Sequence, residues 1–230
     1  MRHHHEVNVK WLPLFRTVLT VLFATMGYTA SLVVAPLRQY PEIREMHVFF
    51  GPSKDPRHSQ TLRTVQEVGE TFGVKLHKHA TKDGFDFDQA LRAYVQTLDK
   101  VREGDLVLFN ASGGPRPMIM AATIFCNTHD IPLLYYDEYD TKEGKQVPLK
   151  AYRSLRGLGD TKRALLQRLK DKGPTDVSGL ASGLNLAMST VSAHVRELLG
   201  KGLVSTERDG KRQVVALTPG IAVMDLEAIA

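Results

Sequence analysis

The sequence has little of what many secreted and metal-binding domains require. Of its 230 residues, one is cysteine and one is tryptophan, and aromatic residues make up 7% of the chain. The single cysteine, Cys126, excludes an intrachain disulfide framework and a cysteine-rich zinc cluster. Because disulfides accumulate in oxidising compartments, this composition favours a reducing, cytoplasmic setting.

Common enzyme signatures are missing as well. The sequence has no Gly-x-Gly-x-x-Gly motif and no phosphate loop ending in Gly-Lys-Ser/Thr, which argues against a dinucleotide coenzyme and a phosphate-loop NTPase. It also lacks the Gly-x-Ser-x-Gly nucleophile elbow. The nine histidines are scattered and show no paired zinc spacing, and His3–His5 is interpreted as a frayed start. The sequence therefore predicts no catalytic residue, no cofactor and no metal.

One long apolar run needs its own interpretation. Residues 11–37 contain a single charged side chain, Arg16, and such a run can resemble a membrane span. Prolines and a glycine interrupt it. It divides into a β-branched strand over Thr17–Ala24, a turn at Thr25–Tyr28 and a helical apolar face over Thr29–Tyr40. We therefore expect no membrane segment.

Further along the chain, strand-like runs alternate with amphipathic helical patterns. The expected strands are Met46–Phe50, Val74–His79, Asp105–Phe109, Ile131–Tyr136 and a short edge strand at Lys145–Leu149, and the expected helices are Arg57–Phe72, Asp86–Val101 and Pro115–Thr128. This alternation predicts an α/β fold, namely a Rossmann-like, doubly wound, mostly parallel sheet with helices on both faces. We assign residues 1–150 to this domain and residues 151–159 to a linker.

Residues 160–230 carry the pattern of a winged helix-turn-helix domain. The expected helices are Asp160–Lys172, Val177–Ser182 and Met188–Leu199, and the expected strands are Leu203–Glu207 and Gln213–Leu217. Asp209-Gly210 between the two strands predicts a hairpin turn in which both of these residues have positive φ. Arg208, Lys211 and Arg212 place three cations at the tip of this wing.

The third helix of this domain has two contrasting faces. A buried stripe is predicted at Val191, Val195, Leu198 and Leu199. The other face carries small and polar residues, namely Ser189, Thr190, Ser192, Ala193, His194 and Arg196. Such residues suit close approach to base edges in the major groove of DNA.

The distribution of charge supports a nucleic-acid partner for the same domain. Net charge is +1 over residues 1–150 and +4 over residues 151–230, and neutralisation of phosphates requires such an excess of cations. The alternatives are a solvated basic face and a surface helix without a partner.

Two loops are expected at the carboxyl edge of the sheet, where ligands bind in doubly wound folds. They are Thr25-Met26-Gly27-Tyr28 and Asn110-Ala111-Ser112-Gly113-Gly114-Pro115-Arg116-Pro117-Met118. In the second loop Asn110 and Ser112 offer side-chain hydrogen bonds and the glycines expose backbone N–H groups. The helix that follows directs its positive end at the same point, and Arg116 adds a cation. This loop suits a phosphate or nucleotide, with a tight turn that binds nothing as the alternative.

These loops, ahead of a winged helix, resemble the CRISPR-associated Rossmann-fold (CARF) domain joined to a helix-turn-helix. The resemblance covers about residues 17–217. The second loop is similar to the family pattern Asp/Asn-x-Ser/Thr-Gly-Gly-Thr-Lys-x-Met at Asn110, Ser112, Gly113, Gly114 and Met118. Two positions differ. Arg116 replaces Lys and keeps the charge, whereas Pro115 replaces Thr and removes one hydroxyl and one N–H.

The resemblance implies an archaeal regulator that binds double-stranded DNA at CRISPR or cas promoters. It implies a homodimer whose residues 1–150 bind a cyclic oligoadenylate, and we favour cyclic tetra-adenylate because a two-fold pocket suits an even ring. Two alternatives stay open. One is a ring nuclease that cleaves cyclic tetra-adenylate without metal, against which the missing Thr at position 115 argues. The other is a winged-helix regulator that senses another nucleotide or metabolite.

Overall fold

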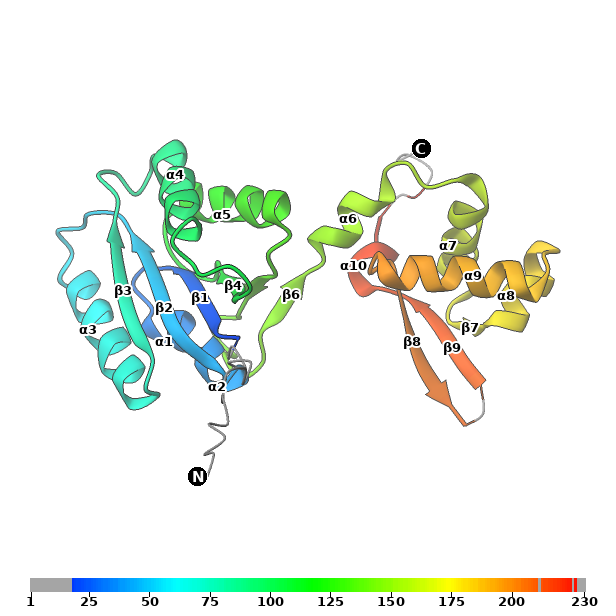
Figure 1. Cartoon of the computed structure of the whole chain (residues 1–230), viewed down its shortest axis with the longest axis horizontal. Coiled ribbons are helices and arrows are strands. Elements are labelled where there is room, and N and C mark those ends of the chain that lie inside the picture. Colours follow the sequence, from blue (N-terminus) through cyan, green and yellow to red (C-terminus); the bar gives the residue numbers. More distant parts are fainter. Residues whose placement is uncertain (1–17, 211, 225, 227–230) are drawn as a thin grey trace, which may run out of the picture.

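The computed structural model describes residues 18–210, 212–224 and 226. The first part of the chain contains β1 Thr20–Thr25, α1 Ala30–Val34, α2 Pro36–Gln39, β2 Ile43–Phe50, α3 Pro56–Thr71, β3 Lys75–Ala80, α4 Phe87–Leu98, β4 Leu106–Asn110, α5 Arg116–His129, β5 Leu133–Tyr135 and β6 Lys145–Val147. The second part contains α6 Leu149–Leu155, α7 Asp160–Lys172, β7 Thr175–Asp176, α8 Val177–Leu184, α9 Met188–Gly200, β8 Val204–Asp209, β9 Arg212–Leu217 and α10 Pro219–Ala222. Figure 1 shows the two parts joined through β6 and α6.

The sheet of the first part has the strand order β3-β2-β1-β4-β5-β6. Strands β1 to β5 are parallel to their neighbours, and β6 pairs with β5 as an antiparallel edge strand. The predicted mixed α/β fold with a mostly parallel sheet is therefore confirmed. Because the chain order reverses between β1 and β4, this is the point of the sheet where a doubly wound fold leaves a crevice.

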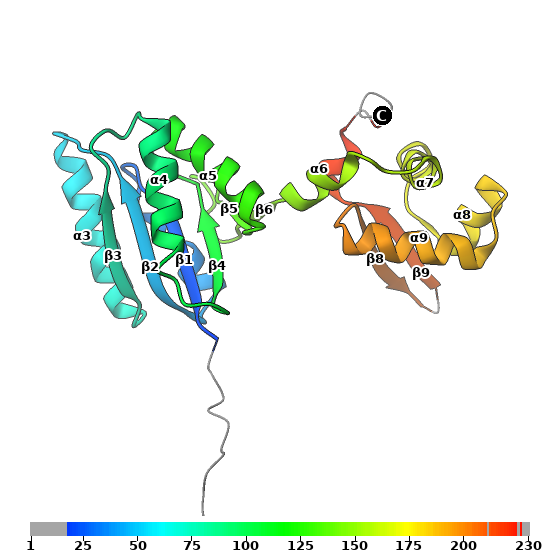
Figure 2. The same cartoon turned by 45° about the horizontal axis from the view of Figure 1, so that its top comes forward.

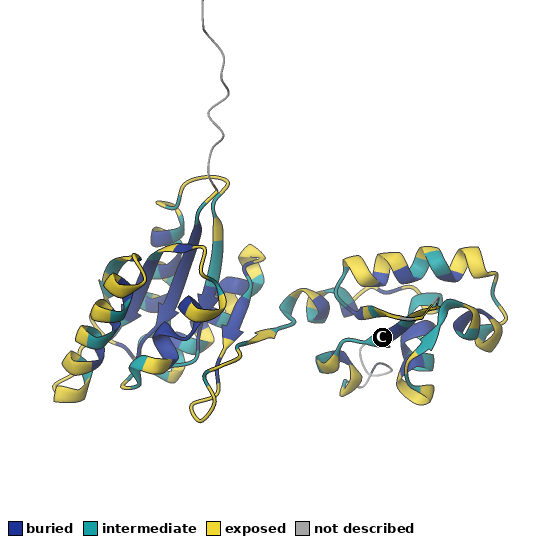
Figure 3. Ribbon diagram, turned by 90° about the horizontal axis from the view of Figure 1, so that it is seen from below, coloured by how far each residue is buried: buried dark blue, intermediate teal, exposed yellow. Residues whose placement is uncertain are grey.

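Helices cover both faces of this sheet, because the strands are apolar on both sides. Leu22 on β1 packs in a cluster with residues of α1, α2 and α3, whereas Phe23 packs in a cluster with residues of α4 and α5. Figure 2 shows α4 and α5 in front of the sheet, and Figure 3 shows the strands as its buried centre. Burial of one such side chain contributes about 1.5–3 kcal/mol. Within the described ranges, no helix is long and apolar enough to cross a membrane.

The helix predicted over residues 29–40 is two short helices instead of one. Pro36 has no N–H, so it cannot donate to the carbonyl of Leu32 one turn earlier, and the helix breaks there. The Asn110 side chain at the end of β4 donates to this free Leu32 carbonyl from its Nδ2, at 2.8 Å. A buried carbonyl requires such a partner, so Asn110 ties β4 to the break between α1 and α2.

The second part of the chain is a winged helix-turn-helix, as predicted. Helices α7, α8 and α9 enclose one apolar core that includes the fully buried Leu165, Leu180 and Leu198. The wing strands β8 and β9 pair antiparallel, and β7 pairs with β9. Asp176 ends β7 and caps α8, since its Oδ1 accepts the Gly179 N–H at 2.7 Å. This backbone hydrogen bond lowers the pKa of the Asp176 carboxyl.

The wing turn lies one residue later than predicted. Asp209 belongs to β8 and pairs with Arg212 on β9, so the turn begins at Gly210. Gly210 has φ of +60°, as the first central residue of a tight hairpin turn requires. Lys211 lies outside the described residues.

The segment predicted as a linker contains most of a helix. Within residues 151–159, Ala151, Leu155 and Leu158 are buried in the core of the second part. On α6, Arg153 donates one hydrogen bond to the backbone oxygen of Asn127 and forms an ion pair with Asp130, at the end of α5. The segment therefore contacts both parts of the chain.

Candidate functional site

A cavity of about 390 Å³ lies at the carboxyl edge of the sheet, at the ends of β1 and β4. It is lined by Met26, Gly27, Tyr28, Thr29, Leu32, Gly51, Pro52, Ser53, His58, Gly84, Phe85, Ser112, Gly113, Gly114, Pro115, Ile119 and Glu138. The loops after all five parallel strands contribute to this wall. Its volume is in the range of small-molecule pockets, toward the lower end.

Both predicted loops reach this cavity, but not with every predicted residue. The predicted residues that do line it are Met26, Gly27, Tyr28, Ser112, Gly113, Gly114 and Pro115. The predicted residues that do not are Thr25, Asn110, Ala111, Met118 and Arg116, of which the first four are buried and Arg116 is exposed. Buried members hold the loops in place, because their side chains point into the domain core.

Asn110 and Ser112 are used mainly inside the protein. Besides its bond to Leu32, Asn110 accepts the Ser112 N–H at 3.1 Å and the Ser112 hydroxyl hydrogen on its Oδ1. Ser112 Oγ accepts the N–H of Tyr136 at 2.8 Å. A hydroxyl has one hydrogen and two lone pairs, so Ser112 keeps a single lone pair for a ligand. Asn110 therefore shapes the loop through these bonds, and its contact with a ligand stays a prediction.

The two loops contact each other through backbone atoms. A Cβ placed on Gly27 would lie 2.8 Å from the backbone nitrogen of Gly114, which is closer than two such atoms approach. Gly114 has φ of +104°, and a Cβ there would lie 3.2 Å from the oxygen of Met26. The two glycines therefore allow the loops to form one continuous cavity floor, and side chains at either position would separate them.

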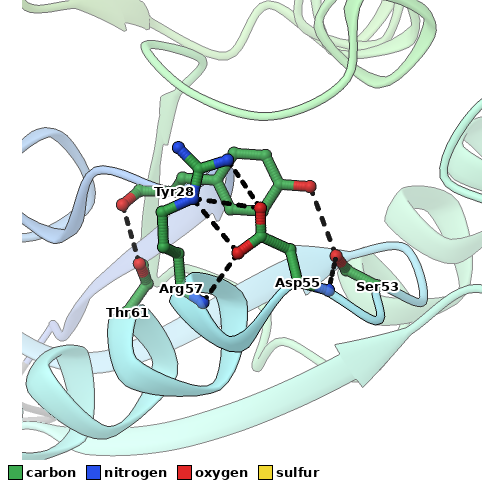
Figure 4. A network of polar contacts seen from close by, with 5 residues as sticks. All are labelled: Tyr28, Ser53, Asp55, Arg57 and Thr61. Carbon is green, nitrogen blue, oxygen red and sulfur yellow. Dashed lines mark hydrogen bonds and ion pairs between the residues drawn. The ribbon is translucent and has the colours of Figure 1, made fainter.

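Tyr28 lines the cavity and is held by residues at and before the start of α3 (Figure 4). Its hydroxyl is 3.2 Å from Ser53 Oγ, and Thr61 Oγ1 donates to its backbone oxygen at 2.8 Å. The Arg57 guanidinium lies over the ring, 4.7 Å from its centre, and pairs with the Asp55 carboxylate. The hydrogen bond from the Arg57 side chain lowers the pKa of Asp55. Tyr28 as a whole is 50% exposed, and these contacts hold its ring in position beside Arg57.

His58 and Glu138 add polar groups to the cavity from outside the two loops. The Nε2 atom of His58 is buried and has no hydrogen-bond partner among the described residues. Burial lowers the pKa of this imidazole, against an opposing effect of Asp55, so the ring is neutral at neutral pH. Glu138 accepts the Thr29 hydroxyl hydrogen at 3.3 Å. The neighbouring Asp137 does not line the cavity and accepts the N–H of Tyr139 at 2.9 Å.

The cavity wall has one carboxylate and no lysine or arginine among its described residues. Arg116, predicted to face the ligand, is the first residue of α5 and is exposed outside the lining. Pro115 and Pro117 at the same helix start have no N–H. The backbone N–H groups at this end of the cavity therefore belong to Gly113 and Gly114, which line it, and to the exposed Arg116.

The second candidate surface is the outer face of α9. Ser189, Thr190, Ala193 and Arg196 are exposed, and Ser192 and His194 are half-buried. Val191, Val195 and Leu198 are buried as predicted, but Leu199 is 42% exposed. At about 100° per residue, Leu199 lies about 80° from Val191 and falls at the edge of the stripe. The small residues leave the helix surface open for close approach.

The wing presents cations beside this helix. Arg208 and Arg212 are both exposed. Arg208 is opposite Gln213 in the ribbon, and Arg212 is opposite Asp209. Because successive side chains of a strand alternate between faces, the two arginines point to opposite faces of the wing tip.

Residues 159–206 match the family model described as bacterial regulatory protein, arsR family. The match spans α7, α8, α9 and the start of β8. It identifies the second part of the chain as a helix-turn-helix of the kind found in regulators. No curated protein matches the sequence.

Solved structures with similarity to the chain include three regulators. A probable transcriptional regulator from Pseudomonas aeruginosa is 27% identical, with a TM-score of 0.30, over 35% of this chain and 70% of that one. A transcriptional regulator from Thermotoga maritima is 24% identical, with a TM-score of 0.28, over 32% and 53%. A MarR family protein from Bacillus stearothermophilus is 24% identical, with a TM-score of 0.28, over 34% and 54%. The chain thus spans about half the length of the last two.

One cluster of side chains contradicts the description of the histidines as scattered. His47, His77 and His79 lie together with Glu45 on β2 and β3. The signal in the sequence is the alternation of Glu45 with His47 and of His77 with His79, which places each pair on one face of its strand. Sequence alone does not give the register between the two strands.

Proposed function

We propose that the chain is a ligand-controlled transcription regulator that binds duplex DNA as a homodimer. The observation that carries this proposal is the exposed polar face of α9 beside a wing with arginines on both faces, in a domain that matches a regulator family. In this proposal α9 enters the major groove, where Ser189, Thr190 and Ala193 approach base edges. Arg196 contacts a phosphate or a guanine, and the wing contacts phosphates.

The exposed side of α5 supports the homodimer. Met120 is 62% exposed and Ile124 is 51% exposed, and residues four apart lie one turn apart on the same side of a helix. In this proposal two copies pair through this side of α5, so that their cavities face a common axis. A Met120→Glu change places a charge in that interface and is expected to give a monomer in sedimentation velocity. An unchanged sedimentation coefficient would place the dimer contact elsewhere.

The proposed ligand is a cyclic oligoadenylate, with cyclic tetra-adenylate as first choice. It binds to the CARF-like first domain, and the regulator as a whole controls CRISPR or cas promoters. Three features support it. Tyr28 and Phe85 provide exposed aromatic rings at the cavity, and bases stack on such rings. His58 has an unused nitrogen for a base edge. The cavity of one subunit, about 390 Å³, suits half of a ring shared across a two-fold axis.

The proposal does not include cleavage of the ligand. The hydroxyl hydrogen of Ser112 is donated to Asn110, and position 115 is a proline. At these two positions the cavity therefore offers no hydroxyl hydrogen that could be donated to a phosphate.

Isothermal titration of the full chain with cyclic tetra-adenylate tests the ligand. We expect one ring per dimer. A Tyr28→Ala variant is expected to bind about 5- to 160-fold more weakly, since loss of one stacked base costs about 1–3 kcal/mol. Tyr139→Ala is the matched control, because Tyr139 is 96% exposed and does not line the cavity. Chromatography of the recovered ligand checks that the ring is intact.

Fluorescence anisotropy with a duplex from the gene's own promoter tests the DNA part separately. We expect the full chain to bind the duplex and the ring to change its affinity. DNA binding that does not respond to the ring would favour a regulator that senses another metabolite. A chain that binds no duplex at low salt would contradict the proposed function as a whole.

A further inference from the structure

The two outer parallel strands of the sheet bring one carboxylate and three imidazoles together. The strand register places His47 on β2 directly beside His77 on β3, and Glu45 beside Lys75. Because side chains alternate along each strand, Glu45, His47, His77 and His79 share the face that α4 covers. The end of α4 and the residues after it close a cavity of about 510 Å³ around this group.

The ligand atoms of three of these residues converge. His77 Nε2 is 3.1 Å from Glu45 Oε2, and His47 Nε2 is 4.0 Å from the same oxygen. One ligand atom from each of Glu45, His47 and His77 lies within 4.8 Å of the others. In a tetrahedral zinc site with bonds of about 2.0–2.1 Å, neighbouring ligand atoms are about 3.3–3.4 Å apart. The three side chains are thus close to the spacing that such a site needs.

His79 supplies the interaction that orients a ligand imidazole. His47 Nδ1 lies 2.9 Å from His79 Nε2, on the side of the ring opposite the atom that faces Glu45. Ligand histidines commonly donate their second ring N–H to such a partner, which fixes the tautomer and leaves the other nitrogen free for metal. The His47 ring is also stacked on His77, with 4.4 Å between ring centres, so both rings have restricted orientations.

The side chains of the cluster differ in how far they are exposed to solvent. The side chain of His47 is 10% exposed, whereas those of His77 and Glu45 are 30% and 32% exposed. A metal ion can therefore enter from solvent without opening the core. Lys75 and Lys100 line the rim of the same cavity but are themselves exposed, and charges of exposed groups are screened by salt.

We propose that Glu45, His47 and His77 bind a zinc ion, with His79 positioning His47, and that this ion joins the edge strand β3 to β2. Two imidazoles and one carboxylate are a donor set that zinc accepts, and three protein ligands leave a fourth position for water or a further group. The site is separate from the cavity at the carboxyl edge of the sheet and does not depend on the ligand proposed for it.

Titration of the full chain with zinc chloride tests the site, in a background where His3, His4 and His5 are replaced by serine. The replacement is needed because three adjacent histidines bind zinc on their own. We expect one zinc ion per chain in this background and a higher melting temperature with zinc than without. His77→Ala and Glu45→Gln are expected to abolish both effects, and His79→Ala to weaken binding about 10–100-fold.

His129→Ala is the matched control, because this exposed histidine of α5 lies outside the cluster. Replacement of zinc by Co²⁺ should give the visible absorption of a tetrahedral ion, and circular dichroism shows whether each variant is folded. Absence of zinc binding in the serine background, or equal binding by a folded His77→Ala variant, would overturn the proposal. Binding of inorganic phosphate at this cluster in place of zinc would do the same.

Discussion

The wing offers the most quantitative test of DNA binding. In the double variant Arg208→Ala/Arg212→Ala, two exposed cations are removed from the wing tip without disturbing a buried residue. If each arginine contacts one phosphate, the slope of log affinity against log salt concentration becomes shallower by about 0.9 per contact. This amounts to about 1.8 for one wing and about 3.6 for the two wings of a dimer.

These slopes translate into a measurable change in affinity. Between about 50 and 200 mM salt, the ratio of wild-type to variant affinity should fall about 10-fold for one wing and about 150-fold for two. Fluorescence anisotropy with one duplex over a series of salt concentrations measures both slopes. Sequence preference should change little, because phosphate contacts carry no base information.

The control variant, Lys82→Ala/Arg92→Ala, removes the same number of charges from exposed positions in the first domain. It lowers the net charge of the chain equally but should leave the salt slope unchanged. A wild-type slope in the wing variant would refute the assignment of the wing to phosphate contacts. Equal effects in both variants would mean that net charge, rather than the wing, governs binding.

Three further predictions concern stability and shape. Gly27→Ala should separate the two cavity loops and lower the free energy of unfolding, measured with urea, by about 1–3 kcal/mol. Gly200→Ala is the control and should cause no such loss, because no atom lies within 4 Å of the added carbon. Leu165→Ala removes a fully buried side chain, so it should lower the free energy of unfolding of the second domain by about 2–5 kcal/mol and weaken DNA binding. A calorimetric scan with only one transition, unchanged from that of the wild type, would contradict this. The lowered pKa of Asp176 means that its capping contribution is present at neutral pH and is lost as pH falls below its usual value of 3.8. Asp176→Asn keeps a hydrogen-bond acceptor at the cap but cannot be protonated in this range, so the free energy of unfolding of this variant should fall less steeply with decreasing pH.

Patterns that depend on one segment at a time were sufficient to predict the fold. Alternation of strand-like and helix-like runs gave the doubly wound sheet, since each run can be recognised from its own periodicity. The faces of α9 followed in the same way from helical spacing, except for Leu199 at the margin of the stripe. Both cavity loops were found because parallel strands all end at one edge.

Features that depend on contacts between distant segments could not be predicted. One such feature is the hydrogen bond from Asn110 to the carbonyl of Leu32, which lies 78 residues earlier in the chain. Pro36 leaves this carbonyl without a helical partner, and no local pattern connects the two segments. The histidine cluster requires the register of β2 against β3. His58 lines the cavity because the segment after β2 reaches the same point as the two predicted loops. The wing turn differed by one residue because the pairing of Asp209 with Arg212 extends the ribbon.

The contacts of Arg153 connect the end of α5 to α6. This helix starts beside the cavity at Pro115 and ends where Asn127 and Asp130 bind Arg153, about 20 Å away at 1.5 Å per residue. Arg153 lies on α6, whose buried residues belong to the DNA-binding domain. In the proposed regulator, a ligand that tilts the start of α5 would also move its far end, and with it the α6 helix that Arg153 joins to the second domain. If that coupling exists, thermodynamic reciprocity requires that DNA which prefers one position of α5 change the affinity for the ligand by the same factor.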